Sequence, residues 1–210
     1  MGLISNATTI FDAGSISAGI GGSLVFIKKL TASSSGTLSF VHGSASVVFN
    51  NTYPVYFFQI INAHPSTSAN FQFQCSIDTG SNYNIANTST TTSAYHGEGG
   101  QTGGTGSYYY IDADNANATS FASITGATST ENDSSASGNL FIFNPSGTTF
   151  AKHWISDINR MDFAGGNGYA NRFQCGGYFN TTSAIDAIQF KFASGNIDSG
   201  TIKLYGIKDS

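Results

Sequence analysis

Apolar side chains recur at every second position along most of this chain, in short runs separated by clusters of Gly, Ser, Asn and Thr. A period of two is typical of a β-strand with one buried face, whereas an amphipathic helix has a period of 3.6. The segment NFQFQCSID (70–78) shows the pattern well, because Phe71, Phe73 and Cys75 share one face. The pattern therefore predicts strands and no amphipathic helix.

About ten segments carry this pattern and are predicted as strands. They are residues 23–30, 37–43, 55–63, 70–78, 108–115, 139–147, 152–163, 172–180, 184–192 and 201–207. The stretch TASSSG between the first two is typical of a hairpin loop. The run VYFFQIINA (55–63) is apolar throughout, which predicts a central strand covered on both faces or nearly so.

The last predicted strand, TIKLYGI (201–207), also alternates. Ile202 and Leu204 lie on one face, and Thr201, Lys203 and Tyr205 lie on the other. A terminal strand that pairs inside a sheet ties down the end of the chain. We therefore expect this segment to belong to the body of the fold.

About ten short strands joined by long crossings favour an all-β fold, namely an antiparallel β-sandwich of jelly-roll-like form. A length of 210 residues suits a single domain over 1–210. The region at about 79–107 is too polar to carry core strands throughout, so the sequence predicts a long polar insertion loop there.

The composition changes the expected surface of this sandwich. Charged residues make up only 10% of the chain, against about 25% in typical soluble domains. The solubilising side chains are hydroxyls and amides, which cost less to cover than Lys or Glu. An ion-poor surface of this kind favours permanent assembly with other subunits.

Charge and hydropathy narrow the possible partners. The net charge is −4 and the cationic residues are scattered, so nucleic-acid binding is not expected. No apolar run approaches about 18 residues, so no membrane-spanning helix is expected. The start of the chain also lacks the features of a signal peptide.

The two cysteines, Cys75 and Cys175, lie in similar contexts, FQFQC (71–75) and RFQC (172–175). They are predicted to be either neighbours across a sheet or two separate buried thiols. Their spacing fits no metal motif and no disulfide framework, which favours the reduced, buried state.

No segment carries a convincing catalytic or metal-binding motif. His96-Gly97-Glu98 is the closest approach to an acid–base pair, but it lies in a Gly-rich stretch that would hold a site poorly. Residues 112–117 crowd oxygen ligands without the Gly and Glu of a calcium-binding loop. A hydrolase would need two facing aspartates, and no such pairing is visible. We predict no catalytic residue, no metal and no cofactor.

Clustered aromatic residues are the remaining candidates for a binding site. Rings in strands are mostly core or subunit contacts, although exposed rings also stack on sugars. The candidates for glycan or subunit contact are Tyr108, Tyr109, Tyr110 and Trp154, and Tyr169 and Tyr178 could also take part.

Residues 137–154 and 184–207 resemble the C-terminal part of small virion structural proteins of tailed bacteriophages. The match covers roughly the last third of the chain. The matching residues are Phe143-Asn144-Pro145-Ser146, Phe192, Ser194-Gly195-Asn196, Ser199-Gly200 and Leu204-Tyr205-Gly206-Ile207.

The resemblance implies a jelly-roll-like module on a phage particle that is assembled in the host cytoplasm. The expected function is that of a non-enzymatic structural protein, a capsid decoration protein that stabilises the shell. The expected partners are copies of the chain, as a trimer, and the major capsid protein or tail components. The alternative is a tail-associated protein that binds a receptor or a glycan.

Overall fold

A computed structural model describes residues 3–5, 8–12, 15–16, 23–100, 108–109, 114–164 and 166–209. All regular secondary structure in these ranges is β, and every strand pairing is antiparallel. Two sheets, one of four strands and one of eight, face each other across a hydrophobic core. The prediction of an all-β antiparallel sandwich is confirmed.

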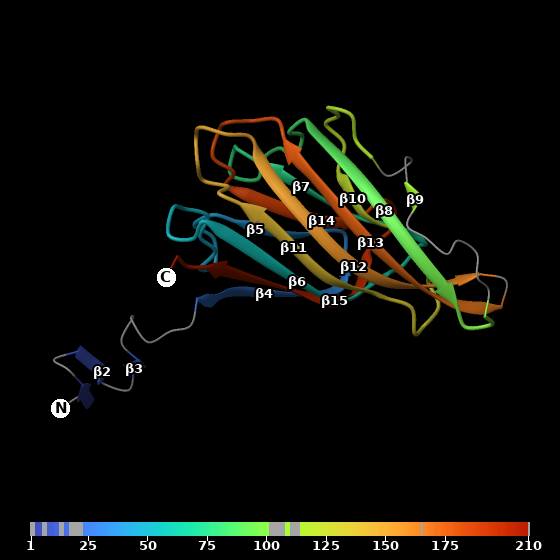
Figure 1. Cartoon of the computed structure of the whole chain (residues 1–210), viewed down its shortest axis with the longest axis horizontal. Coiled ribbons are helices and arrows are strands. Elements are labelled where there is room, and N and C mark those ends of the chain that lie inside the picture. Colours follow the sequence, from blue (N-terminus) through green and yellow to red (C-terminus); the bar gives the residue numbers. More distant parts are fainter. Residues whose placement is uncertain are drawn as a thin grey trace.

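The large sheet has the strand order β4-β15-β6-β11-β12-β13-β8-β9 (Figure 1). Its strands are β4 (Leu24–Ser35), β15 (Ile197–Ile207), β6 (Val55–Pro65), β11 (Ala136–Phe143), β12 (Lys152–Ala164), β13 (Asn167–Phe179), β8 (Asn87–Gly97) and β9 (Tyr108–Tyr109).

The small sheet has the order β10-β7-β14-β5. Its strands are β10 (Ala122–Thr128), β7 (Ala69–Ser76), β14 (Ala187–Phe192) and β5 (Leu38–Val41). A separate three-stranded sheet is formed by β1 (Leu3–Ser5), β2 (Thr8–Asp12) and β3 (Ser15–Ile16).

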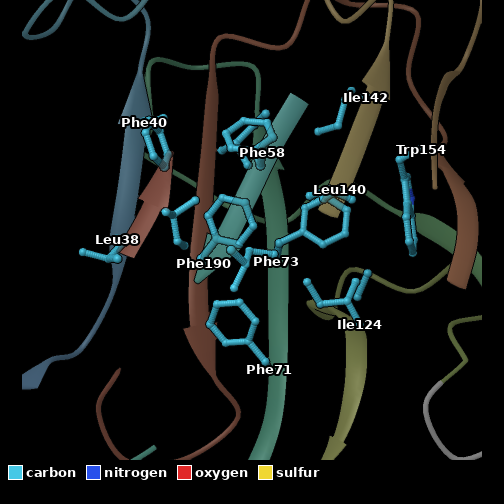
Figure 2. Close-up of a cluster of buried hydrophobic side chains, with 14 of the residues drawn as sticks. Leu38, Phe40, Phe58, Phe71, Phe73, Ile124, Leu140, Ile142, Trp154 and Phe190 are labelled. Atoms are coloured by element: carbon cyan, nitrogen blue, oxygen red, sulfur yellow. The ribbon is translucent and has the colours of Figure 1, made fainter. Parts of the chain in front are cut away.

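The core between the two large layers is rich in phenylalanine. Phe190 of β14 contacts Phe58 of β6 and Phe73 of β7, at ring-centroid distances of 5.3 and 6.1 Å. Phe73 also meets Trp154 of β12 edge to face at 4.9 Å. Figure 2 shows these rings together in one cluster that both sheets contribute to. Burial of such large apolar surfaces is the main force that holds the two layers together.

Strand β6 lies in the middle of the large sheet, between β15 and β11, as the apolar run predicts. Its inward side chains Tyr56, Phe58 and Ile60 are buried. Its outward side chains, including Phe57 and Ile61, are only half-buried. The expected cover on the second face is therefore incomplete in the single chain.

The prediction of a long insertion loop at about 79–107 is wrong for part of this region. Strand β8 occupies Asn87–Gly97 and pairs with β13 along its whole length. Its inward residues are polar yet buried, among them Asn87, Thr91 and Ser93. The sequence reasoning failed because it required apolar side chains inside. β-branched threonine favours the extended backbone even without them.

The expected hairpin at TASSSG is also wrong. Strand β4 continues through this stretch to Ser35 and pairs with β15, while β5 belongs to the opposite sheet. Ser33 and Ser35 remain paired with Ser199 and Ile197 of β15, so the chain crosses between layers only after Ser35.

Both cysteines are free and buried, which confirms the reduced reading. Burial raises the pKa of the Cys75 thiol well above its ordinary value. Neighbouring Gln74 is also fully buried, because its Nε2 donates to the carbonyl oxygens of Ile85 and Ser120, each at 3.0 Å. The glutamine thus holds the segments around Ile85 and Ser120 against the small sheet.

Candidate functional site

The outer face of the large sheet carries a continuous row of aromatic side chains. Four neighbouring strands contribute Phe26 (β4), Tyr205 (β15), Phe57 (β6) and Phe141 (β11), which are paired in register. Consecutive ring centroids are 5.6, 5.6 and 4.8 Å apart. Cross-strand aromatic pairs of this kind stabilise a sheet and build one flat apolar surface.

The row continues with Ile155 of β12, which is opposite Phe141, and with Gly176 of β13, which is opposite Ile155. We call these six residues, from Phe26 to Gly176, the aromatic row. Phe26 is 56% exposed and Ile155 is 50% exposed. Large apolar side chains this exposed, at both sides of a continuous row, are typical of an interaction surface.

A second apolar line runs parallel to the aromatic row, two residues further along each strand. Leu24, Ile207, Val55 and Phe143 are paired in register across β4, β15, β6 and β11. Leu24 and Phe143 are exposed. The apolar surface is thus at least two residues deep along the strands.

Gly176 forms the floor of a shallow depression at one side of the aromatic row. The depression is lined by Phe141, Ile155 and Thr90, and it continues past Gly176 toward Tyr178 and His153. A Cβ built on Gly176 would meet nothing closer than 3.8 Å. The fold therefore does not require glycine here, and the missing side chain leaves room for a group from outside.

A polar row lies on the other side of the aromatic row. It consists of Lys29, Lys203, Gln59, Asn139, Asp157 and Gln174, which are paired in register from β4 to β13. Its cations are on β4 and β15, whereas its carboxylate is on β12.

Asp157 is held by Arg172 of β13, whose Nε donates to Oδ1 at 2.8 Å and whose Nη2 donates to Oδ2. The hydrogen bonds from Arg172 lower the pKa of Asp157, so this carboxylate is ionised at neutral pH. No hydrogen bond or ion pair is observed for Lys29 or Lys203 within the described part of the chain. The β4–β15 side of the polar row therefore carries two cations that are unpaired among these residues, whereas the carboxylate on the β12–β13 side is paired with Arg172.

The aromatic candidates of the sequence are not gathered into one site. Tyr108 and Tyr109 form β9 beside β8, and Tyr110 lies outside the described residues. Trp154 is 1% exposed and packs on Phe73, so it serves the core of the single chain. Of the other rings considered, Tyr178 lines the depression at Gly176.

The weaker chemical candidates are held in structural contacts. The backbone N–H of Gly168 donates to Glu98, at 3.3 Å. Asn115 donates from Nδ2 to Oδ1 of Asn87 at 2.7 Å, so it braces a loop. Among the described residues, which include neither Asp112 nor Ala113, no group of three or more His, Cys, Asp or Glu could hold a metal ion.

A polar depression lies at the opposite end of β6, where Asp133 and Asp198 both contribute to its lining. Ser34 donates to Oδ1 of Asp198 at 2.8 Å, and Nδ1 of His64 lies 2.7 Å from the carbonyl oxygen of Ser134. No Phe, Tyr or Trp lines it that could stack on a sugar. Its polar groups are largely engaged in joining loops.

Residues in the segments 137–154 and 184–207 shape turns and close contacts. Asn144 has a φ of 43°, and its backbone N–H donates to the carbonyl oxygen of Pro54 at 2.6 Å. The N–H of Asn196 donates to Oγ of Ser66 at 2.8 Å, which joins the β14–β15 turn to the β6–β7 turn. These contacts fix the turns at the ends of the strands.

The aromatic row was missed by sequence reasoning, although a signal was present. The apolar run in 55–63 indicated that both faces of one strand should be covered. Phe141 and Tyr205 lie beside Phe57 only because β6 is between β11 and β15, and this strand order was not predictable.

No protein-family model, curated protein or solved structure matches the chain. Among the described residues, no helix is long and apolar enough to cross a membrane.

Proposed function

We propose that the protein is a non-enzymatic structural component of a tailed-bacteriophage particle, and specifically a capsid decoration protein. The observation that carries the proposal is the outer face of the large sheet, where the aromatic row and a second apolar line are left partly exposed. Exposure of these apolar side chains to water costs free energy. That cost is removed when another subunit covers the surface.

Two further features support an assembly role. The chain is ion-poor, with 10% charged residues, so little charge has to be desolvated at a contact. The segments 137–154 and 184–207 resemble virion structural proteins, and their residues shape turns and glycine contacts in this fold.

We also infer that eight strands form a jelly roll. In chain order these are β4, β5, β6, β7, β10, β11, β14 and β15, and the chain changes sheet at every step except from β7 to β10, which both lie in the small sheet. The last strand, β15, lies beside the first, β4. Strands β8, β12 and β13 then extend the large sheet at one edge, which widens the exposed face.

The proposal is tested on phage particles purified from a strain that carries the gene. Mass spectrometry and cryo-electron microscopy should find the chain in many copies, at fixed lattice points of the shell. A single complex at one vertex would favour the tail instead. Absence of the chain from the particles would contradict a virion role.

A glycan-binding tail protein is the second candidate. The rings of Tyr178 and His153 border the depression at Gly176, where a sugar ring could stack. Oligosaccharides released from the host envelope would then bind the wild-type chain and bind a Tyr178→Ala variant at least about tenfold more weakly. Equal binding by the two chains, or no binding, would remove this candidate.

A further inference from the structure

We propose that the partner on the outer face of the large sheet is a second copy of this chain, in a dimer whose two-fold axis runs parallel to the strands. The β4–β15 side of one copy then packs against the β12–β13 side of the other. This inference rests on the proposed function only in taking that face as a docking surface.

The order of the strands sets which residues meet. When two copies of one sheet face each other about an axis parallel to their strands, the strand order of the second copy is reversed. Strand β4 of one copy therefore meets β13 of the other, β15 meets β12, and β6 meets β11. Each row stays at its own level, so the aromatic row meets itself.

Shape is complementary in this arrangement. Phe26, the most exposed ring of the aromatic row, lies opposite the depression at Gly176 of the other copy. Tyr205 lies opposite Ile155, and Phe57 lies opposite Phe141. The ring of Phe26 thus faces a glycine, which leaves space for it. In the other two pairs, large apolar side chains face each other.

Charge is complementary at one position of the polar row. There Lys203 of one copy lies opposite Asp157 of the other, and Gln59 lies opposite Asn139. The cation would extend the Asp157–Arg172 pair across the contact. No carboxylate on the β4–β15 side of this row repels Asp157.

The area is adequate for a stable contact. Six strands about 4.8 Å apart, with four outward residues on each, span on the order of 700 Å². A standard interface buries roughly 800 Å² per partner. Aligned sheets cross at about 30°, which separates facing residues more the further they lie from the centre of the face. Lys203 and Asp157 lie only about 7 Å from that centre, so their side chains remain within reach of each other.

The test is a charge exchange, read out as mass by sedimentation equilibrium of the full chain. Lys203→Asp alone and Asp157→Lys alone each place like charges at every contact. Each should weaken association by about tenfold or more. The double variant K203D/D157K restores opposite charges at both Lys203–Asp157 positions of the dimer and should associate within about threefold of the wild type.

The matched control combines Lys203→Asp with Asp133→Lys, an exposed carboxylate in a loop away from the face. This pair of changes should leave association as weak as in K203D alone. Circular dichroism of each variant verifies that the chain is folded. The restored double variant itself guards against misfolding as the cause, because both single changes are present in it.

Two results would overturn the inference. One is a wild-type chain that stays monomeric through the micromolar range, and the other is a dimer that neither single reversal weakens. Both leave the virion proposal intact, because shell subunits could still cover the face. Conversely, a charge-dependent dimer that is absent from phage particles would contradict the virion proposal alone.

Discussion

Gly206 of β15 lies directly beneath the ring of Tyr53. A Cβ at this position would be 2.2 Å from Cγ of the tyrosine, which is far inside van der Waals contact. The glycine belongs to the segment LYGI (204–207), so this residue has a clear packing reason. The glycine is visible in the sequence, but its contact with the ring of Tyr53 could not be predicted from the sequence.

Gly206→Ala should therefore lower the free energy of unfolding by about 1–3 kcal/mol, since Tyr53 must move or the strand must bend. Urea denaturation measures the change. Gly36→Ala is the matched control, because its Cβ would have no neighbour closer than 3.8 Å, and it should change stability by less than about 0.5 kcal/mol. Equal losses in the two variants would contradict the contact.

Asp78 fixes the turn after β7. Ser76 donates to its Oδ1 at 2.6 Å, and Nδ2 of Asn82 donates to its Oδ2 at 2.7 Å. These hydrogen bonds lower the pKa of Asp78 from 3.8 to about 2. Because the folded state holds this proton less tightly than the unfolded state, the stabilisation is present above pH 3.8 and is lost as the pH falls toward 2.

Asp78→Asn should flatten the pH dependence of the melting temperature between about pH 4 and pH 2, since the variant has no proton to gain there. Asp133→Asn, in an exposed loop, should leave the slope as in the wild type. Thermal melts at a series of pH values make the comparison. An unchanged slope in Asp78→Asn would show that the turn does not hold the carboxylate as described.

At the scale of elements, the alternation of apolar side chains predicted which residues of a strand point inward. It was less successful in predicting which strands are neighbours in a sheet. The inward position of Ile202 and Leu204 in β15 is confirmed, because both side chains are buried. The apolar run of β6 was correctly taken as central. These residues are visible in the sequence because burial of one face requires a period of two.

Strand β8 and the path of β4 were beyond this reasoning. β8 buries hydroxyls and an amide, and the Nδ2 of Asn87 donates to the carbonyl oxygen of Ser120 at 2.8 Å. Such hydrogen bonds depend on loops that are distant in the sequence. Likewise, Ser35 remains in β4 only because β15 continues beside it.

Leu204→Ala tests the role of β15 as an inner strand of the sheet. The side chain is fully buried, so its loss should cost about 2–4 kcal/mol of unfolding free energy. Thr201→Ala, on the outward face of the same strand, should cost less than about 1 kcal/mol. Chemical denaturation that found the two costs equal would contradict the assigned faces.

At the scale of the whole molecule, the composition and the alternation predicted an all-β sandwich with an ion-poor exterior. They could not predict that one sheet has eight strands while the other has four. Nor could they predict which outward side chains gather in the aromatic row, which no further layer of the described residues covers. Strand order decides which outward residues become neighbours, and that order is a property of the complete fold.

Ile155→Glu should abolish assembly without unfolding the single chain. Ile155 is half exposed near one end of the aromatic row, so a carboxylate is solvated in the monomer but buried in any contact there. Size-exclusion chromatography should show the shift to a smaller species, and circular dichroism should show intact strands. A variant that assembled like the wild type would place the contact elsewhere.

The mass of the unmodified full chain in solution is the most direct test of the central claim, that copies of the chain cover this face. Sedimentation equilibrium should give a whole-number multiple of 22.0 kDa in the micromolar range, and 22.0 kDa for the Ile155→Glu variant. An unmodified chain that sediments at 22.0 kDa throughout that range would contradict it.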